Sequence, residues 1–181
     1  MPDPGELWTI GHWTCPESAF LEFLGGPGIT LLADVRSQPG SRRSAQFDRD
    51  EMPRWLASAG IDYLHLPDLG GRRGRQPVDE SVNAGWRQRS FHNYADYTLG
   101  ETYQRGVDRL AELAATERVA IMCGEPMPWR CHRLLIANTL AARDWTIWHL
   151  MGDAPPRRHV LGQWGAQPSI DGDGVVTYPA E

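Results

Sequence analysis

Lysine is absent from this chain, so all 18 basic residues are arginine. They are outnumbered by 23 acidic residues, and the net charge of -5 disfavours a protein that coats nucleic acid generally. The arginines nevertheless cluster, at Arg36, Arg42 and Arg43 and again between residues 72 and 89. Because a guanidinium group offers a rigid fork for phosphate or carboxylate, these clusters predict a specific anionic ligand.

Cysteine is also scarce. The three cysteines, Cys15, Cys123 and Cys131, argue against a disulfide framework. Each must therefore serve as core filler, as a ligand or as a reactive thiol.

Long apolar runs are missing as well. No stretch approaches the roughly 20 residues needed to cross a bilayer. The first residues, MPDPGELW, lack the basic and apolar regions of a secretory signal. We therefore expect a cytoplasmic protein without a membrane partner, and the sequence leaves its oligomeric state open.

What is present fits one globular domain. The chain has 181 residues, of which 41% are hydrophobic, and it contains no internal repeat. We predict an α/β domain over residues 1–152, followed by a Pro/Gly-rich extension, residues 153–181, packed on or near it.

Strand and helix patterns alternate about five times along the domain. The expected strands cover 7–12, 29–36, 61–71, 119–123 and 146–150, and the expected helices cover 18–26, 49–60 and 94–117, with a last one opening at Cys131. Ser18 is expected to cap the first helix. Residues 72–91 are expected to form a functional or mobile loop, and VVTYP at 175–179 an edge strand or a surface segment.

This alternation predicts a single three-layer α/β sandwich with a mostly parallel, Rossmann-like sheet of about five strands. The order 3-2-1-4-5 is one of several that right-handed crossovers allow. In such a sheet, the residues that end each strand meet at one rim, where ligands bind.

Chemistry is concentrated where the fourth strand meets the last helix. Cys123, Glu125, Cys131 and His132 are the candidate catalytic residues. A thiol at a helix amino terminus beside arginine and histidine has a stabilised thiolate, and Cys131 fits this description better than Cys123. The alternative is that Cys123 is a core residue and Cys131 a cap. Pro126 and Pro128 remove two N–H donors, so the loop is a weak anion nest.

The candidate substrate-binding residues follow the other strand ends. They are His12, Asp34, Arg36, Ser37, Ser41, Arg42, Gly70, Gly71, Arg72, Tyr94 and Arg133. Structural alternatives exist for several of them. Asp34 could pair with Arg36 or Arg133 and pin loops together, the two glycines could permit a sharp turn, and Tyr94 could belong to the core.

Arg133 lies in the expected first turn of a helix, where a cation opposes the helix dipole. This unfavourable placement predicts a buried or half-buried anionic partner. The partner would be a carboxylate, such as Glu125 or Asp34, or a bound phosphate.

Five motifs also carry a resemblance. The sequences TIGH (9–12), ADVRSQPGSR (33–42), YLHLPDLGG (63–71), FHNYADY (91–97), and MCGE followed by CHR (122–133) resemble the prokaryotic family called domain of unknown function 488. The likeness runs from about Trp8 to His149 and implies a compact α/β domain. The family has no generally established reaction to carry over.

Our leading hypothesis is an enzyme, such as a cysteine-dependent transferase or hydrolase, acting on a phosphorylated or nucleotide-like substrate. The alternative is a non-catalytic nucleotide or nucleic-acid binding module. A metal-binding or thiol redox protein is a second alternative, but the cysteine spacing is unlike that of structural zinc sites. We expect no metal and no cofactor.

Overall fold

The computed structural model describes residues 5–40 and 43–181. A six-stranded sheet forms its centre, in the order β3-β2-β4-β1-β5-β6. Its strands are β1 (Glu6–Gly11), β2 (Leu31–Asp34), β3 (Asp62–His65), β4 (Val119–Cys123), β5 (Thr146–Leu150) and β6 (Arg157–Arg158). The first five are parallel and β6 is antiparallel to β5, so the predicted α/β class with a mostly parallel sheet is confirmed.

The predicted strand order 3-2-1-4-5 is wrong. β1 and β4 are neighbours as expected, but β4 lies between β2 and β1 instead of beyond β1. Every residue of β4 is buried, as an interior strand requires, yet both orders give it two neighbours. Apolar patterning therefore could not distinguish them.

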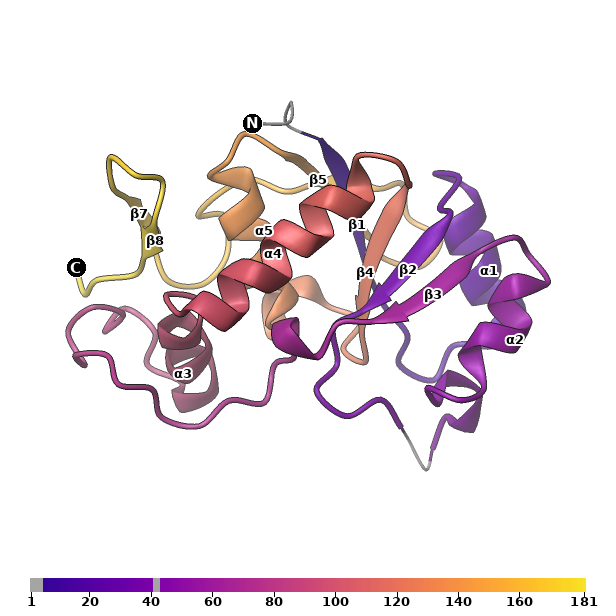
Figure 1. Ribbon diagram of the computed structural model, residues 1–181, viewed down its shortest axis with the longest axis horizontal. Helices are drawn as coiled ribbons and strands as arrows, with labels where there is room; N and C mark the ends of the chain where they lie inside the picture. Colours follow the sequence, from indigo (N-terminus) through magenta and orange to yellow (C-terminus); the bar gives the residue numbers. More distant parts are fainter. Residues whose placement is uncertain (1–4, 41–42) are drawn as a thin grey trace.

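Helices cover both faces of the sheet (Figure 1). On one face, α1 (Glu17–Gly25) and α2 (Met52–Ala57) pack Phe20, Leu24 and Leu56 against Trp8 and Met122. On the other face lie α3 (Arg89–Tyr97), α4 (Glu101–Ala114) and α5 (Arg133–Ala141), whose apolar residues join the second core cluster. Successive strand residues alternate between the two clusters, as the period of a strand dictates.

Several helix boundaries differ from the sequence-based expectation. The helix expected over 94–117 is two helices, because Gly100 is extended at ψ 160° and forms the amino-terminal cap of α4. Helix α1 begins at Glu17 after an extended Pro16, so Ser18 does not cap it. Helix α5 begins at Arg133, because Cys131 is extended at φ -136° and ψ 149°.

Three short 3-10 helices, η1 (Ala45–Phe47), η2 (Pro67–Leu69) and η3 (Pro128–Arg130), lie in connecting segments. In the tail, β7 (Ser169–Ile170) and β8 (Val176–Thr177) pair with each other and, among the described residues, with no other strand. Val176 and Tyr178 are nonetheless buried within the α4 and α5 core cluster. No helix in the described ranges combines the length and apolarity needed to span a membrane.

Candidate thiol site

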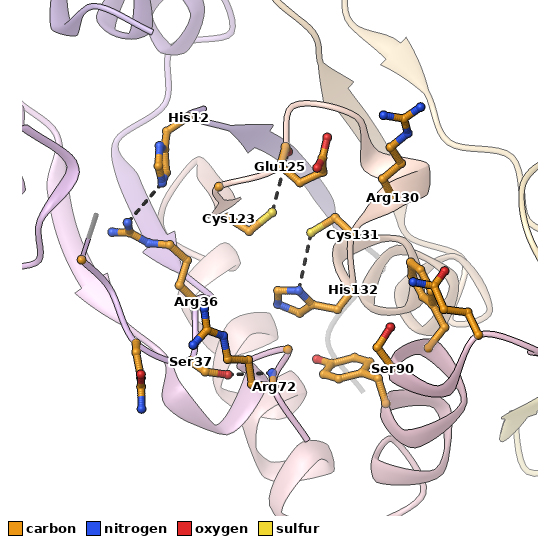
Figure 2. Close-up of a pocket in the computed structure, with 17 residues that line it drawn as sticks. His12, Arg36, Ser37, Arg72, Ser90, Cys123, Glu125, Arg130, Cys131 and His132 are labelled. Atoms are coloured by element: carbon orange, nitrogen blue, oxygen red, sulfur yellow. Dashed lines mark hydrogen bonds between the residues drawn. The ribbon is translucent and has the colours of Figure 1, made fainter. Parts of the chain in front are cut away.

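A cavity of about 460 Å³ opens at the carboxyl ends of β1, β2 and β4 (Figure 2). Because these strands are parallel and adjacent, the residues that follow them meet at one rim. The cavity is lined by His12, Arg36, Ser37, Gln38, Gly40, Gly71, Arg72, Gln88, Ser90, Phe91, Tyr94, Cys123, Gly124, Glu125, Arg130, Cys131 and His132. All four candidate catalytic residues therefore share one cavity.

Arg133 is fully buried behind the cavity, with 0% of its surface exposed. Its Nε lies 3.1 Å from Cys123 Sγ and 3.5 Å from Cys131 Sγ. Its Nη1 donates to Thr9 Oγ1 at 3.1 Å, and its Nη2 donates to the backbone carbonyl of Glu125 at 2.5 Å. Within the described residues no carboxylate pairs with it, so the predicted bond to the Glu125 or Asp34 carboxylate is wrong. The ionisable groups in contact with this cation are the thiols of Cys123 and Cys131.

The two thiols are shifted in opposite directions. Burial alone would raise the pKa of Cys131. A hydrogen bond from Cys123, the positive charge of Arg133 and the Arg133 backbone N–H outweigh burial and lower that pKa to about 6. Burial raises the pKa of Cys123 well above its usual range, and its interaction with Cys131 adds to this. The Cys123 thiol also has the Glu125 carbonyl as an acceptor, at 3.8 Å. The pair thus accommodates one negative charge, on Cys131, while Cys123 keeps its proton.

His132 lies half-buried between Cys131 and β2. Its Nε2 is 2.7 Å from the carbonyl oxygen of Val35, which can only accept, so Nε2 carries the hydrogen. In the neutral ring, Nδ1 is then a free acceptor, and it lies 3.5 Å from Cys131 Sγ. Burial lowers the pKa of His132, which favours this neutral form. His132 is thereby placed to accept a proton from the Cys131 thiol.

Glu125 contributes mainly through its backbone. Its carbonyl accepts from Arg133, whereas its carboxylate accepts from the Met127 N–H at 3.4 Å. The loop therefore turns a carbonyl acceptor toward the site, in keeping with the two proline positions that lack N–H donors. Gly11 at the end of β1 permits this close approach, because a Cβ built there would lie 1.9 Å from the Glu125 oxygen.

We expect Gly11→Ala to displace the 124–130 loop, since the clash is with backbone atoms. The free energy of unfolding should fall by about 1–3 kcal/mol, as for other overpacked positions. Gly25→Ala is the matched control, because a Cβ added there would meet no neighbouring group within 4 Å, and its stability should be unchanged or slightly higher. Urea denaturation of both variants tests this, and equal stability of the two would contradict the placement of the loop.

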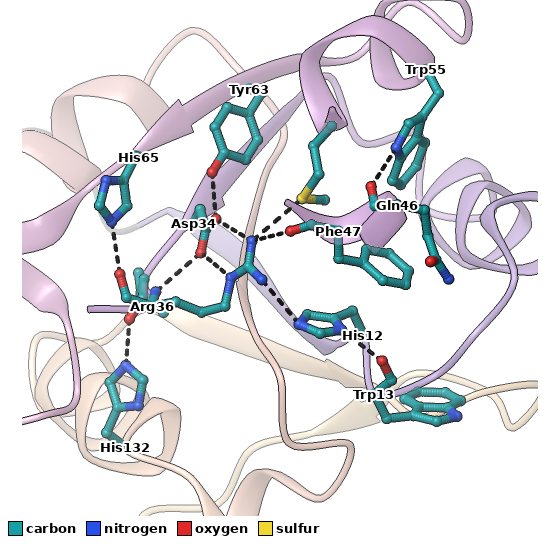
Figure 3. A network of polar contacts seen from close by, with 12 residues as sticks. His12, Trp13, Asp34, Arg36, Gln46, Phe47, Trp55, Tyr63, His65 and His132 are labelled. Carbon is teal, nitrogen blue, oxygen red and sulfur yellow. Dashed lines mark hydrogen bonds and ion pairs between the residues drawn. The ribbon is translucent and has the colours of Figure 1, made fainter. Parts of the chain in front are cut away.

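Asp34 and Arg36 form a closed structural network beside the cavity (Figure 3). Arg36 pairs with Asp34 through Nε at 2.9 Å and Nη2 at 2.8 Å, and its Nη2 also donates to the Phe47 carbonyl at 2.7 Å. Asp34 is fully buried and accepts a further hydrogen bond from the Tyr63 hydroxyl. Asp34 and Arg36 thus form the structural ion pair that was the alternative to substrate binding. The other possible pair, Asp34 with Arg133, does not form.

His12 belongs to the same network. Burial lowers its pKa to about 4, so the ring is neutral at physiological pH. Its Nδ1 donates to the Trp13 carbonyl at 2.8 Å, and its Nε2 accepts from Arg36 Nη1 at 3.2 Å. The ring stacks on Phe47 with centroids 4.4 Å apart. His12 therefore lines the cavity, and hydrogen bonds at both ring nitrogens hold its side chain in place.

Ser37 and Gly71 line the cavity, and Gly70 packs against Ser37 beside it. Ser37 Oγ accepts the Arg72 N–H at 2.8 Å. A Cβ at Gly70 would lie 2.6 Å from Ser37 Oγ, and one at Gly71 would lie 2.4 Å from His132 Nδ1. The two glycines are thus needed for close packing against the site, in line with their structural interpretation.

Tyr94 is 1% exposed and donates its hydroxyl to the Leu69 carbonyl at 2.7 Å. Its ring meets His132 edge to face, so it supports the site from the core and is not available to stack on a base. Ser41 and Arg42, also predicted to bind substrate, lie outside the described residues.

Sequence reasoning missed several lining residues, among them Arg130, Gln38, Gln88 and Ser90. The last two come from the amino end of α3, which the sequence pattern had placed in a loop. Arg130 was visible as a cation next to Cys131, but nothing in its spacing indicated that it lines the cavity. Within the described residues, no group of three or more His, Cys, Asp or Glu side chains is arranged to hold a metal ion.

Comparison with known proteins identifies a family for this chain. No curated protein and no solved structure matched the chain. The family model described as Domain of unknown function DUF488 matches residues 18–140 of the 181. This stretch includes β2, β4, both site cysteines and Arg133. The chain therefore belongs to the DUF488 family.

Proposed function

We propose that the protein is an enzyme in which the Cys131 thiolate attacks an anionic substrate held in the cavity. One observation carries this proposal. The fully buried Arg133 guanidinium has two thiol sulfurs, a hydroxyl and a backbone carbonyl as its partners. A buried cation needs a compensating anion. A thiolate at Cys131 supplies it, and a thiolate is the reactive form of cysteine.

The residues around Cys131 have complementary roles in such a reaction. His132 Nδ1 takes the proton of any protonated Cys131. The sulfur then forms a bond to the electrophilic atom of the substrate, and the bond from that atom to the leaving group breaks. The leaving group departs with the electron pair of that bond and takes a proton from water, or from His132 where His132 has deprotonated Cys131. Transfer to water would make the protein a hydrolase, and transfer to another acceptor would make it a transferase.

The anionic group of the substrate is assigned to Arg72 and Arg130. Both side chains are exposed, and both line the cavity on opposite sides of the thiols (Figure 2). Ser90 adds a hydroxyl in the first turn of α3, whose free N–H groups favour negative charge. Arg36 is a weaker candidate, since Asp34 already neutralises it.

We expect inorganic phosphate to slow alkylation of Cys131 by iodoacetamide, because an anion bound near the thiolate blocks the approach of reagent to it. Arg72→Ala and Arg130→Ala should each weaken this protection, with the phosphate concentration for half-protection rising by about 10-fold for one lost charged hydrogen bond. Arg75→Ala is the matched control, because Arg75 is exposed in the same loop as Arg72 but does not line the cavity.

Equal protection in all three variants would refute the assignment of these arginines. Absence of protection in the unaltered protein would refute phosphate as a mimic of the substrate anion. Sulfate and chloride at matched ionic strength separate specific binding from charge screening.

A thiol redox function is the second candidate, and one observation favours it. The same Nε–H of Arg133 contacts both sulfurs, so the Sγ atoms of Cys123 and Cys131 lie next to each other beside one donor. Treatment with a mild disulfide oxidant followed by peptide mapping distinguishes the two functions. A reversible Cys123–Cys131 disulfide formed in preference to mixed disulfides would favour the redox function, and mixed disulfides at Cys131 alone would favour the nucleophile.

A further inference from the structure

A buried polar chain leads from Arg133 away from the cavity and into the tail. Thr9 Oγ1, which accepts from Arg133, lies 2.7 Å from His149 Nδ1. His149 Nε2 lies 3.0 Å from His159 Nδ1, and His159 Nε2 lies 2.8 Å from Asn138 Oδ1. Thr9, His149 and Asn138 are 0% exposed, and His159 is 6% exposed. The chain therefore joins β1, β5, α5 and the tail in surroundings with little access to water.

The orientation of the Asn138 amide, whose Oδ1 faces His159, sets the order of hydrogens in the chain. The Asn138 Oδ1 can only accept, so His159 Nε2 carries a hydrogen and the neutral ring accepts at Nδ1. His149 must then donate from Nε2 and accept at Nδ1. Thr9 consequently donates to His149 and accepts from Arg133, which can only donate. All four hydrogen bonds run in one direction, from the guanidinium to the amide.

Tyr178 continues the network beyond Asn138. With Oδ1 of Asn138 facing His159, the Asn138 Nδ2 donates to the Tyr178 hydroxyl at 3.0 Å. The tail thus supplies two members of the network, His159 and Tyr178.

Both histidines stay neutral across the physiological range. Burial, with the nearby His159, Arg133 and Arg157, lowers the pKa of His149 to about 3, and burial lowers that of His159 to about 4. The Trp164 ring covers both, with centroids 5.5 Å from His149 and 6.4 Å from His159. The direction of the chain is therefore stable wherever the thiolate exists.

We propose that His149 and His159 are positioning residues of the thiol site, which fix the plane of the Arg133 guanidinium through Thr9 so that its Nε–H faces the sulfurs. This inference rests on the proposed function, because a cysteine thiolate is the group that the oriented guanidinium stabilises. It assigns His159, a tail residue well beyond the last site motif, a role in setting the reactivity of Cys131.

The test is the pH dependence of Cys131 alkylation in His159→Phe and His159→Asn, followed by peptide mapping. Phenylalanine fills the site but leaves the His149 Nε2–H without an acceptor. The hydrogen bonds from Arg133 through Thr9 to His149 then lose their fixed direction. The pKa of the Cys131 thiol should rise by about one unit, as expected for a weakened hydrogen bond to a charged group. Asparagine offers an oxygen near the position of Nδ1 and should restore much of the original profile.

A second pair of variants covers the case in which His159→Phe fails to fold. Thr9→Val breaks the chain at its first link with little change of shape, and Thr9→Ser keeps the hydroxyl. Thr9→Val should raise the thiol pKa, and Thr9→Ser should not. The groups that face Cys131 directly, Cys123, His132 and Arg133, remain in every variant.

Val176→Ala is the control for simple loosening of the tail, since Val176 is buried in the same core but lies outside the polar chain. It should lower the denaturation midpoint and leave the thiol pKa unchanged. An unchanged pKa in both His159→Phe and Thr9→Val, or an equal shift in Val176→Ala, would overturn the positioning role. An ordinary thiol pKa in the unaltered protein would instead overturn the proposed function itself.

Discussion

Replacing Arg133 with methionine should slow alkylation of Cys131 at neutral pH by about 100-fold. The side chain keeps its approximate length and apolar stem, but the positive charge and the Nε–H that contacts both sulfurs are lost. Burial then acts on Cys131 without compensation, and its pKa should rise from about 6 to 9.0 or above. The thiolate fraction at pH 7 falls from most of the population to about 1%, which gives the expected factor.

Arg133→Lys is the informative companion variant. Lysine retains the charge but cannot donate simultaneously to sulfur, to Thr9 and to the Glu125 carbonyl as the guanidinium fork does. Its thiol pKa should fall between those of the unaltered protein and Arg133→Met. If Arg133→Met folds and alkylates at the original rate, the guanidinium is not the partner of the thiolate.

Cys131→Ser should remove a rise in folding stability that the unaltered protein shows between pH 6 and pH 9. The pKa of Cys131 is about 6 in the folded state and 9.0 in its ordinary state, so between these values the unfolded chain binds a proton that the folded chain does not. Stability due to this group is therefore complete above pH 9 and is lost as the pH falls through 6. Three units of pKa correspond to roughly 4 kcal/mol.

The comparison between variants isolates this contribution. The buried histidines His12, His149 and His159 also reduce stability in acid, but they are present in both proteins and cancel in the difference. Cys15→Ser is the matched control, since Cys15 is buried and its pKa is raised. Urea denaturation at pH 6, 7.5 and 9 measures the free energy of unfolding of each protein. A pH dependence that is the same in Cys131→Ser and in Cys15→Ser would contradict the thiolate assignment.

The sequence indicates the joint between β4 and α5 as the candidate site, because a connection that only had to turn would not need two cysteines, a histidine and two arginines. The structure brings Cys123, Cys131 and His132 of this joint into one cavity. The expected bounds of β4 and β5, residues 119–123 and 146–150, match those observed. β4 is a short apolar run followed by Gly124, and β5 is a short segment rich in β-branched and aromatic residues; both patterns are typical of strands.

The partners within the site could not be predicted in the same way. The sequence predicts a carboxylate or a bound phosphate as the partner of Arg133. The structure places its Nε against two sulfurs, while Asp34 is already paired with Arg36 and Tyr63. The Tyr63 contact depends on β2 and β3 being neighbours, which apolar patterning does not specify. Similarly, His149 and His159 have no motif, and only the fold brings the tail to Thr9.

The most direct test of the central claim is the rate at which iodoacetamide alkylates each cysteine of the unaltered protein between pH 5 and pH 9, resolved by peptide mapping. We predict that Cys131 reacts fastest at neutral pH with a midpoint near 6, while Cys123 and Cys15 react slowly throughout. Slow alkylation of Cys131 with a midpoint at or above its ordinary 9.0, or faster labelling of Cys123, would contradict this claim.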